Sequence, residues 1–484
     1  MAAPTRSRLL TPSRAGFVLG LFLAVLVALP ADAQAPPTNA DATSDSSGDP
    51  EDSGHPGWQA DRQPPYAGSG WRESEGGSPS ETFESVGVQL RSWLTPADLD
   101  PAATEANDCW GYVSPSGREY ALIGLSTGTA IVEVSDPGDA QLVSFVAGPN
   151  SGWRDIKTYG AYAYAVSEGG GGIQVIDLGQ VDAGVVTLVN TVITGGSLHT
   201  HDVAVNTESG RLYRLGGPGS LDRGLRIYSL DDPALPDFLG RWNDRYCHDA
   251  QVVTWTEAPF AGTEVAFCFA NDASSGGNPG IEILDVTDPA SVSVIGSINL
   301  SDPPIFSHPA SYSHQGWLST DRRYLYFDDE ADESVSGTPT TTRIIDVSDL
   351  SSPLQVATFS NGNTARDHNL FTWGSLIFEA NYRSGLRVFD ASDPLAPVEI
   401  AWFDTYPDDD DAHYNGLWGV YPFLPSGTVI GSDIERGLFV WTIDAVEVPS
   451  ASAVGLLVAA LALGATGARS LRSQRLPRDK STHS

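Results

Sequence analysis

GLRIYS, at Gly224 to Ser229, is one of seven copies of a short pattern in which a small residue precedes alternating apolar residues and a polar ending. The other copies are GIQVID at 172–177, GIEILD at 280–285, TTRIID at 341–346, GLRVFD at 385–390, GLFVWT at 437–442 and the most divergent, GTAIVE, at 128–133. Their last residues lie 44 to 61 positions apart, a period typical of four-stranded propeller blades. Seven copies therefore predict an all-β, seven-bladed β-propeller.

Each repeat divides into short apolar strands separated by Gly, Pro, Asn and Asp, the residues of tight turns. The third repeat gives the predicted strands His201–Val205, Leu212–Leu215, Leu225–Tyr228 and Asp237–Trp242. The last repeat lacks an outer strand, and we expect Val86–Leu94, a strand-like segment before the first repeat, to pair there and close the ring. An open array of β-sandwiches and a β-solenoid are the alternatives, but a solenoid has shorter and more regular repeats.

The N-terminal 80 residues have the composition of a targeting segment and a linker. Residues 1–33 contain three arginines, an apolar run from Phe17 to Leu29 and Ala31-Asp32-Ala33, which predicts a signal peptide cleaved before Gln34. The apolar run is too short for a membrane-spanning helix, which needs about 20 residues. Residues 34–80 are rich in Pro, Gly, Ser and acids and poor in aliphatic residues, so we expect a disordered acidic linker before a propeller at 81–444.

The C-terminal 40 residues, 445–484, predict a hydrophobic helix that anchors the chain in a membrane. Eighteen uncharged residues, Ala451 to Ala468, are followed by five basic residues, a stop-transfer pattern that keeps the preceding chain outside the cell. The order of these features resembles bacterial sorting signals of the PEP-CTERM kind, although the Pro-Glu-Pro core is absent. A permanent single-span anchor is the alternative. Both interpretations place the propeller at the cell surface or the outer face of a membrane.

The charge of the chain excludes one class of partner. The formal net charge is −34, and residues 34–468 alone carry −40, because eight of the 27 basic residues but only two of the 61 acids lie in the end segments. Such a surface repels nucleic acid. The three cysteines exclude a disulfide-rich scaffold. Cys247 and Cys268 fall where the ends of a predicted hairpin meet, so we expect that pair, and not Cys109, to form any bridge.

The repeats also resemble those of a known family over residues 83 to 444. They are similar to LVIVD-repeat proteins, and more closely to the set called choice-of-anchor B proteins. The segments that carry this resemblance, besides the repeats, are WRDIK at 153–157, YCHDAQ at 246–251, SHQGW at 313–317, DHNL at 367–370, Asn381-Tyr382 and WGVYP at 418–422. The resemblance implies an exported propeller with a C-terminal anchor, and it implies no catalytic residues.

Two sets of polar residues recur at fixed places in the predicted blades. The innermost strands begin with the pairs Arg154-Asp155, His201-Asp202, His248-Asp249, His314-Gln315, His368-Asn369 and Tyr414-Asn415. The second strands end with the acids Glu168, Asp272, Asp329, Glu379 and Asp433. Because these two strands are antiparallel neighbours, both sets are expected to surround one mouth of the central channel.

Imidazole and carboxylate groups arranged around one channel mouth suit a divalent metal ion. A divalent metal is therefore the candidate cofactor. The candidate metal ligands are His201, His248, His314 and His368. An oxygen-only set would suit calcium instead, and the same groups could act as general acids and bases. The alternative is structural, because polar residues repeated in every blade often hydrogen-bond between strands. The candidate ligand-binding residues are Arg154, Asp155, Asp202, Asp249, Gln315, Asn369, Glu168 and Glu379.

Two functional hypotheses follow. The first is a non-enzymatic surface module that binds an extracellular protein, a glycan or a small ligand, and it rests on the anchor, the linker and the lack of a recognisable catalytic motif. The second is a metal-assisted hydrolase or lyase at the channel mouth, with the four histidines as ligands and Asp202, Asp249 or Glu379 as candidate bases.

Overall fold

The computed structural model of the chain describes residues 58–271, 279–300 and 312–444. The predicted signal peptide at 1–33, the first part of the predicted linker at 34–57 and the predicted anchor at 445–484 lie outside the described residues. Among those that are described, no helix combines the length and the apolar character needed to cross a membrane.

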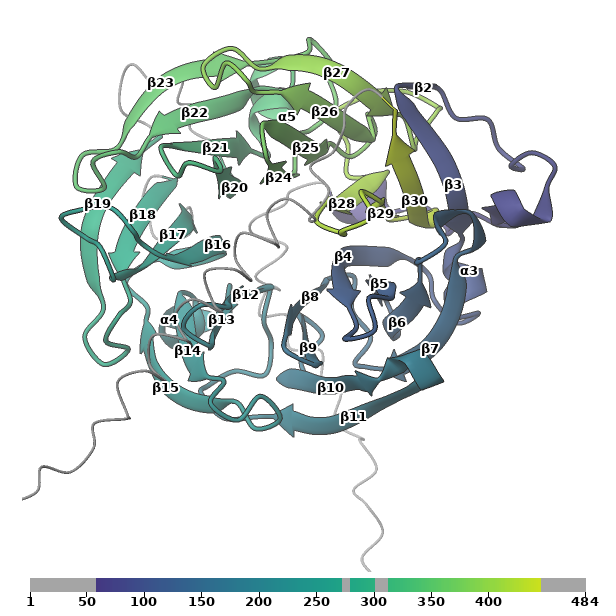
Figure 1. Cartoon of the computed structure of the whole chain (residues 1–484). Coiled ribbons are helices and arrows are strands. Elements are labelled where there is room, and N and C mark those ends of the chain that lie inside the picture. The colour runs from purple at the N-terminus through teal and green to yellow at the C-terminus, as the bar shows by residue number, and fades with distance from the viewer. Residues whose placement is uncertain (1–57, 272–278, 301–311, 445–484) are drawn as a thin grey trace, which may run out of the picture. The chain divides into compact units, whose positions relative to one another are not determined.

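Seven antiparallel sheets form a ring, which confirms the predicted seven-bladed propeller (Figure 1). Within each blade the strands follow one another in chain order from the channel outwards. Blades one to three are β4 (Ala106–Val113), β5 (Glu119–Leu125), β6 (Gly128–Glu133) and β7 (Gln141–Ala147); β8 (Arg154–Tyr159), β9 (Tyr162–Ser167), β10 (Ile173–Gln180) and β11 (Val185–Val192); and β12 (Asp202–Asn206), β13 (Arg211–Leu215), β14 (Leu225–Ser229) and β15 (Asp237–Trp242). The third blade matches its predicted strands to within one residue at each end.

The remaining blades follow the same order. Blades four to six are β16 (Tyr246–Thr254), β17 (Glu264–Asn271), β18 (Gly280–Asp285) and β19 (Ser293–Asn299); β20 (Ser313–Leu318), β21 (Tyr324–Asp329), β22 (Thr342–Asp346) and β23 (Leu354–Phe359); and β24 (Asn369–Trp373), β25 (Leu376–Ala380), β26 (Leu386–Asp390) and β27 (Val398–Phe403). Blade seven holds β28 (Leu417–Tyr421), β29 (Val429–Asp433) and β30 (Gly437–Ile443). Short helical turns connect strands at α3 (Pro96–Leu99), η2 (Pro137–Asp139), η3 (Val181–Ala183), α4 (Gly219–Asp222) and α5 (Asp332–Ser336).

The third strand of each blade is buried on both faces because it lies between two sheets. This explains the near-continuous apolar runs of the repeat. Ile227, Ile283 and Val388 in these strands are fully buried, whereas the outermost strands alternate exposed and half-buried residues. The core is therefore a series of apolar clusters between neighbouring blades.

The N-terminal strand closes the ring, as predicted. β3 (Val88–Leu94) pairs antiparallel with β30 and supplies the missing outer strand of blade seven. Trp93 in β3 is fully buried, stacks on Phe439 with ring centroids 5.6 Å apart, and donates its indole N–H to the Arg436 carbonyl at 2.7 Å. This strand joins the beginning of the domain to its end.

Residues 58–80 differ from the prediction, which assigned them to a disordered linker. They contain α2 (Trp58–Asp61), β1 (Trp71–Arg72) and η1 (Glu73–Glu75), and β1 pairs with the outer edge of β3. A further short strand, β2 (Ser85–Val86), pairs with β27 of blade six. The segment lacks aliphatic residues, but it is held by backbone pairing and by side chains such as Arg62, which contacts Glu105 at 2.6 Å. Composition alone does not reveal such contacts.

The structure joins Cys247 to Cys268 in a disulfide across the β16–β17 hairpin, which confirms the predicted pair. Cys109 is a buried free thiol.

We predict that Trp93→Ala lowers the free energy of unfolding by about 3–5 kcal/mol, because it removes a large buried side chain from the closing strand. Val86→Ala is the control: Val86 is 52% exposed in the neighbouring β2, and its truncation should change stability by less than about 0.5 kcal/mol. Urea unfolding of the purified proteins measures both. Equal effects of the two substitutions would show that β3 does not hold the ring.

Candidate functional site

The innermost strands are irregular where they reach the channel. The pairing of β16 with β17 shifts register between Cys247 and Asp249, and β20 shifts in the same way between Ser313 and Gln315. A bulge of this kind inserts one extra residue and turns its side chain out of the ladder. The extra residues are His248 and His314, so the bulges aim imidazoles at the propeller axis.

Blade seven corrects the predicted alignment. Its bulge lies between Leu417 and Gly419, so Trp418 occupies the place of the histidines. The predicted pair, Tyr414-Asn415, lies before β28. The Asn415 amide there donates to Glu435 at 2.7 Å. A bulge adds a residue without altering the apolar pattern, so sequence alignment could not locate it.

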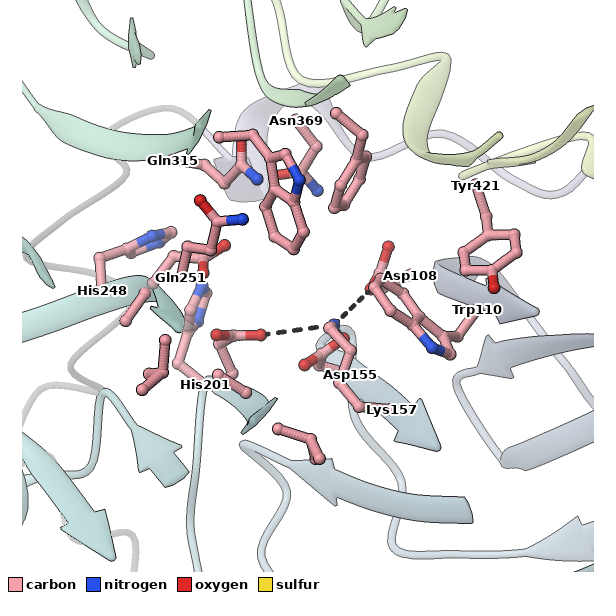
Figure 2. A pocket seen from close by; sticks show the side chains of 18 of the residues that line it. Asp108, Trp110, Asp155, Lys157, His201, His248, Gln251, Gln315, Asn369 and Tyr421 are labelled. Atoms are coloured by element: carbon pink, nitrogen blue, oxygen red, sulfur yellow. Dashed lines mark hydrogen bonds and ion pairs between the residues drawn. The ribbon is translucent and has the colours of Figure 1, made fainter. Parts of the chain in front are cut away.

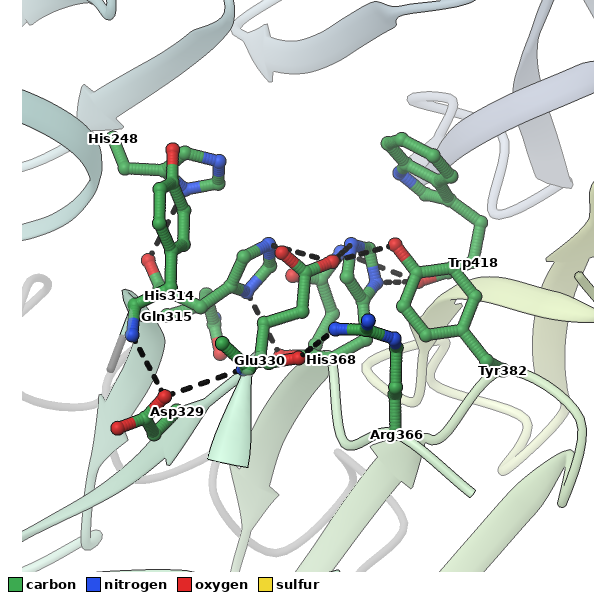
Figure 3. A network of polar contacts seen from close by, with 12 residues as sticks. His248, His314, Gln315, Asp329, Glu330, Arg366, His368, Tyr382 and Trp418 are labelled. Carbon is green, nitrogen blue, oxygen red and sulfur yellow. Dashed lines mark hydrogen bonds and ion pairs between the residues drawn. The ribbon is translucent and has the colours of Figure 1, made fainter. Parts of the chain in front are cut away.

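The histidines form a hydrogen-bonded chain from blade to blade (Figure 3). The Nδ1–H of His248 donates to the His314 carbonyl at 3.3 Å, that of His314 to the His368 carbonyl at 3.1 Å, and that of His368 to the Trp418 carbonyl at 2.5 Å. Adjacent imidazole rings lie 4.0 to 4.4 Å apart from His201 to His368. With Nδ1 protonated, a neutral ring presents Nε2 as a lone-pair donor.

Glu330 joins this hydrogen-bonded chain at the channel mouth where the innermost strands begin. The repeat pattern did not predict it as a site residue. Its Oε1 lies 3.8 Å from Nε2 of His314 and 3.8 Å from Nε2 of His368, and it accepts the Tyr382 hydroxyl at 2.6 Å. One ligand atom from each of His314, Glu330 and His368 can lie within 4.8 Å of the others. Glu330 follows Asp329, the residue that the repeat singled out, by one position.

His201 has a different partner. Its Nδ1 contacts the carboxylate of Glu168, so these two predicted residues do meet. Burial alone would lower the pKa of His201, but the neighbouring Glu168 charge raises it above the usual value. The Glu168 carboxylate at Nδ1 therefore favours the protonated form of His201, whereas Nδ1 of His314 and of His368 faces a backbone carbonyl.

Beyond the histidines, the buried ammonium group of Lys157 lies among aspartates in the channel (Figure 2). Lys157 Nζ lies 2.5 Å from Asp155, 3.3 Å from Asp108 and 3.8 Å from Asp202, and 4.7 Å from the centre of the Trp110 ring. Lys157 and Asp108 were not among the predicted site residues. Asp108 occupies the polar-pair position of blade one, for which the sequence predicted no pair.

The pKa of Asp155 shifts in the opposite direction from the pKa values of the other aspartates in this cluster. Burial raises the pKa of Asp155, but the adjacent Lys157 charge and the hydrogen bonds from Asp202, Asp108 and Lys157 together lower it below the usual value. Burial raises the pKa of Asp108 and of Asp202 well above the usual value. The pKa of Asp249 is raised, again by burial. Asp155 and Lys157 thus form the ion pair, and the outer aspartates hold protons readily.

Several predicted ligand-binding residues hold neighbouring blades together. Asp155 accepts the Val203 amide at 2.7 Å, Gln315 accepts the Leu370 amide at 2.9 Å, and Asn369 donates to the Trp418 carbonyl at 3.3 Å. These contacts support the structural alternative for those positions. Arg154 is buried, and its guanidinium donates to the Leu125 and Pro149 carbonyls.

Glu379 lies away from the channel histidines, inside blade six. It accepts the Thr342 hydroxyl and the Asn381 amide, each at 2.8 Å, and burial raises its pKa to about 7. Asp433 likewise accepts backbone amides of Glu435 and Arg436. The second predicted column therefore contributes Glu168 to the channel, while Asp272 lies outside the described residues.

The channel contains a cavity of about 470 Å³. It extends from the histidines, where the innermost strands begin, toward the ends of those strands. Its floor includes Lys157, Asp202, Asp249 and the four histidines. Its wall includes an aromatic cluster from blades one, five, six and seven, in which Trp317 and Phe371 have ring centroids 4.8 Å apart. The residues of this cluster are Trp110, Trp317, Phe371, Tyr421 and Phe423.

Fold and site together define a seven-bladed β-propeller with a polar, partly aromatic central channel. No protein-family model matches the chain, and no curated protein does so. Among solved structures, hydrazine synthase from Kuenenia stuttgartiensis is 12% identical over 70% of this chain and 95% of that chain, with a TM-score of 0.47. The computationally designed protein Ika8 is 10% identical over 73% and 89%, with a TM-score of 0.43. Neither similarity supports an argument about function.

We predict that Lys157→Met lowers the free energy of unfolding by about 3–5 kcal/mol at pH 8, because it leaves buried carboxylates without their cation. The deficit should shrink at pH 5. The wild-type ion pair stabilises the fold above the ordinary carboxyl pKa of about 4, and without Lys157 the buried aspartates relieve the loss by taking up protons as pH falls.

The matched control is Arg323→Met, since Arg323 pairs with Asp346 but its side chain is 58% exposed. Its substitution should cost at most about 1 kcal/mol at either pH. Urea unfolding at pH 5 and pH 8 provides all four values. A Lys157→Met deficit that did not change with pH would contradict the assignment of this charge cluster.

Proposed function

We propose that this chain is an exported, cell-surface-anchored binding module that takes a small organic cation into its central channel. The observation that carries the proposal is the 470 Å³ cavity, which combines a carboxylate floor with an aromatic wall. Cavities of this volume, mainly apolar with a few convergent polar groups, are typical of small-molecule sites.

The charge of the cavity favours a cation. Five acids line it, Glu208 and the four aspartates Asp108, Asp155, Asp202 and Asp249, against three basic residues, Lys157, Arg154 and Arg322. The Arg154 guanidinium is bound to backbone carbonyls. A protonated amine that contacts Asp202 and Asp249 would stabilise the ionised form of both carboxyls, since an opposite charge within about 6 Å favours ionisation.

The aromatic wall favours an organic cation over an inorganic one. Trp110 already holds the Lys157 ammonium over its ring face, so the wall is electrostatically suited to positive charge. Trp317 and Phe371 offer further ring surface for an apolar or cyclic ligand body. The ligand class is thus a protonated amine on an apolar or ring-shaped body, free or presented by a larger extracellular partner.

Export and anchoring are supported by the sequence at the two ends. Residues 1–33 have the pattern of a signal peptide, and residues 445–484 that of a membrane anchor. The resemblance of the repeats to LVIVD-repeat proteins of the choice-of-anchor B family supports the same location.

Benzylamine and its neutral counterpart benzyl alcohol are the probes that test this function. In isothermal titration calorimetry at pH 7.5 we expect the amine to bind at least tenfold more tightly than the alcohol. Asp202→Asn and Trp317→Ala should each weaken amine binding about tenfold or more, because they remove a counter-charge and a ring face. Tenfold corresponds to about 1.4 kcal/mol.

Asp237→Asn is the matched control, since Asp237 is an exposed carboxylate on the outermost strand β15. It should bind benzylamine as the wild type does. Equal affinity for the amine and the alcohol, or an undiminished affinity of both site variants, would refute the proposal. Circular dichroism of each variant distinguishes loss of a contact from loss of the fold.

A second candidate, a metal-assisted enzyme, is favoured by the arrangement of His314, Glu330 and His368. Two imidazoles and one carboxylate are a common catalytic zinc set, and their Nδ1 bonds to carbonyls and the Tyr382 bond to Glu330 would orient all three ligands. A zinc ion held there would polarise bound water for hydrolysis.

Elemental analysis after dialysis against micromolar zinc tests this candidate. We expect one zinc per chain in the wild type, and its loss from His314→Ala and His368→Ala but not from the control His199→Ala, whose side chain is exposed. Absence of zinc from the wild type, or its retention by both variants, would exclude the metal-assisted mechanism.

A further inference from the structure

A second group of carboxylates lies behind the channel, between blades five and six. It is formed where β21 ends, where α5 begins, and in the loop before β24. Among the residues that the structure describes, five acids meet there with one guanidinium group, that of Arg343. All of these side chains are buried: Asp328, Asp329, Asp332, Glu333, Asp367 and Arg343.

Three of the acids point at one another. One carboxylate oxygen from each of Asp332, Glu333 and Asp367 lies within 4.8 Å of the other two. Arg343 donates to one oxygen of Asp332 at 2.7 Å. The other oxygen of Asp332 has no hydrogen-bond partner among the described residues.

These oxygens lack the donors that buried carboxylates require. Asp367 is fully buried and Glu333 is 3% exposed, yet in the part of the chain that the structure describes no hydrogen bond reaches either oxygen of either side chain. Buried polar groups are nearly always hydrogen-bonded, and an unpaired buried charge costs several kcal/mol. Five acids and one arginine bring a large negative charge together, and either a bound cation or bound protons must offset it.

The ligand set identifies the cation. Every inward atom is a carboxylate oxygen, which favours a hard ion over zinc or copper. Mg²⁺ retains several waters and strict octahedral geometry, whereas Ca²⁺ accepts six to eight oxygens and bidentate carboxylates. Two acids whose oxygens are all without a donor, in a site shielded from solvent, therefore favour Ca²⁺.

We propose that Asp332, Glu333 and Asp367 bind one Ca²⁺ ion between blades five and six. Asp328 and Asp329 add negative charge around the ion, and Arg343 orients Asp332. The site is separate from the organic-cation cavity, since none of the three ligands lines that cavity.

The position of this site connects it to the channel. Asp367 immediately precedes His368, and Asp329 immediately precedes Glu330, which contacts His368. A calcium ion that joins α5 to the 365–368 loop would fix the two segments that present Glu330 and His368. Calcium should therefore stabilise the blade junction as well as neutralise it.

Thermal unfolding of the purified protein in EGTA and in calcium tests the proposal. We expect 2 mM CaCl₂ to raise the midpoint by at least 5 °C over 1 mM EGTA, since a ligand that binds only the folded state stabilises it by mass action. Two millimolar MgCl₂ should have a much smaller effect. Calorimetric titration of the EGTA-treated protein should give one calcium per chain.

Asp367→Asn should abolish the calcium-dependent shift while unfolding in EGTA at or above the wild-type midpoint, because it removes charge repulsion together with the ligand. Glu333→Gln is a second variant with the same expectation, should the first not fold. The matched control is Asp408→Asn, in the exposed acidic run 408–411, which should keep the full calcium response. His314→Ala should also keep it, which separates this site from the channel histidines.

Two results would overturn the calcium site. One is a wild-type midpoint that is the same in EGTA and calcium, together with no bound calcium by elemental analysis; the carboxyls would then share protons instead of a cation. The other is an undiminished calcium response in both Asp367→Asn and Glu333→Gln. Either leaves the organic-cation proposal intact, because benzylamine binding is measured separately and can be repeated in EGTA-containing buffer.

Discussion

The architecture depends on one constraint. Seven innermost strands converge on a single axis, and the polar groups of their first residues must form hydrogen bonds with one another. The molecule meets this constraint with hydrogen bonds that run from blade to blade. Histidine Nδ1–H groups donate to a backbone carbonyl of the next blade. Asp155 and Gln315 each accept a hydrogen bond from a backbone N–H of the next blade. The groups that close the axis are therefore also those that line the channel. Structure and any binding function share these side chains.

The repeat made the architecture predictable because each copy records the same physical situation. A third strand that lies between two sheets must be apolar on both faces, and the tight turns around it need Gly, Pro, Asn and Asp. These demands recur in every blade, so the number of blades and the third-blade strands could be predicted. The missing outer strand was predictable for the same reason, because an unpaired edge requires a partner.

The candidate sites were less predictable because they depend on departures from the repeat. Trp418 takes the histidine position through a bulge, and Glu330 lies one residue beyond the repeated acid. Asp332 and Glu333 belong to α5, an insertion in one blade, and they meet Asp367 only across a blade junction. Lys157 carries no repeat signal. Such contacts arise from the packing of blades against each other, which periodicity within one blade does not encode.

The pairing of β3 with β30 has a consequence for how the domain is made. β3 lies near the beginning of the domain and β30 at its end, so roughly the whole length of the domain separates partners that must lie side by side. A ribosome or a translocation channel delivers the chain from its beginning, and blade seven cannot be completed until Ile443 has emerged. During that time the edge of Val88–Leu94 that pairs with β30 has no partner strand. Ring closure is therefore the last pairing to form. A truncated chain that ends before β30 leaves the β3 edge unpaired.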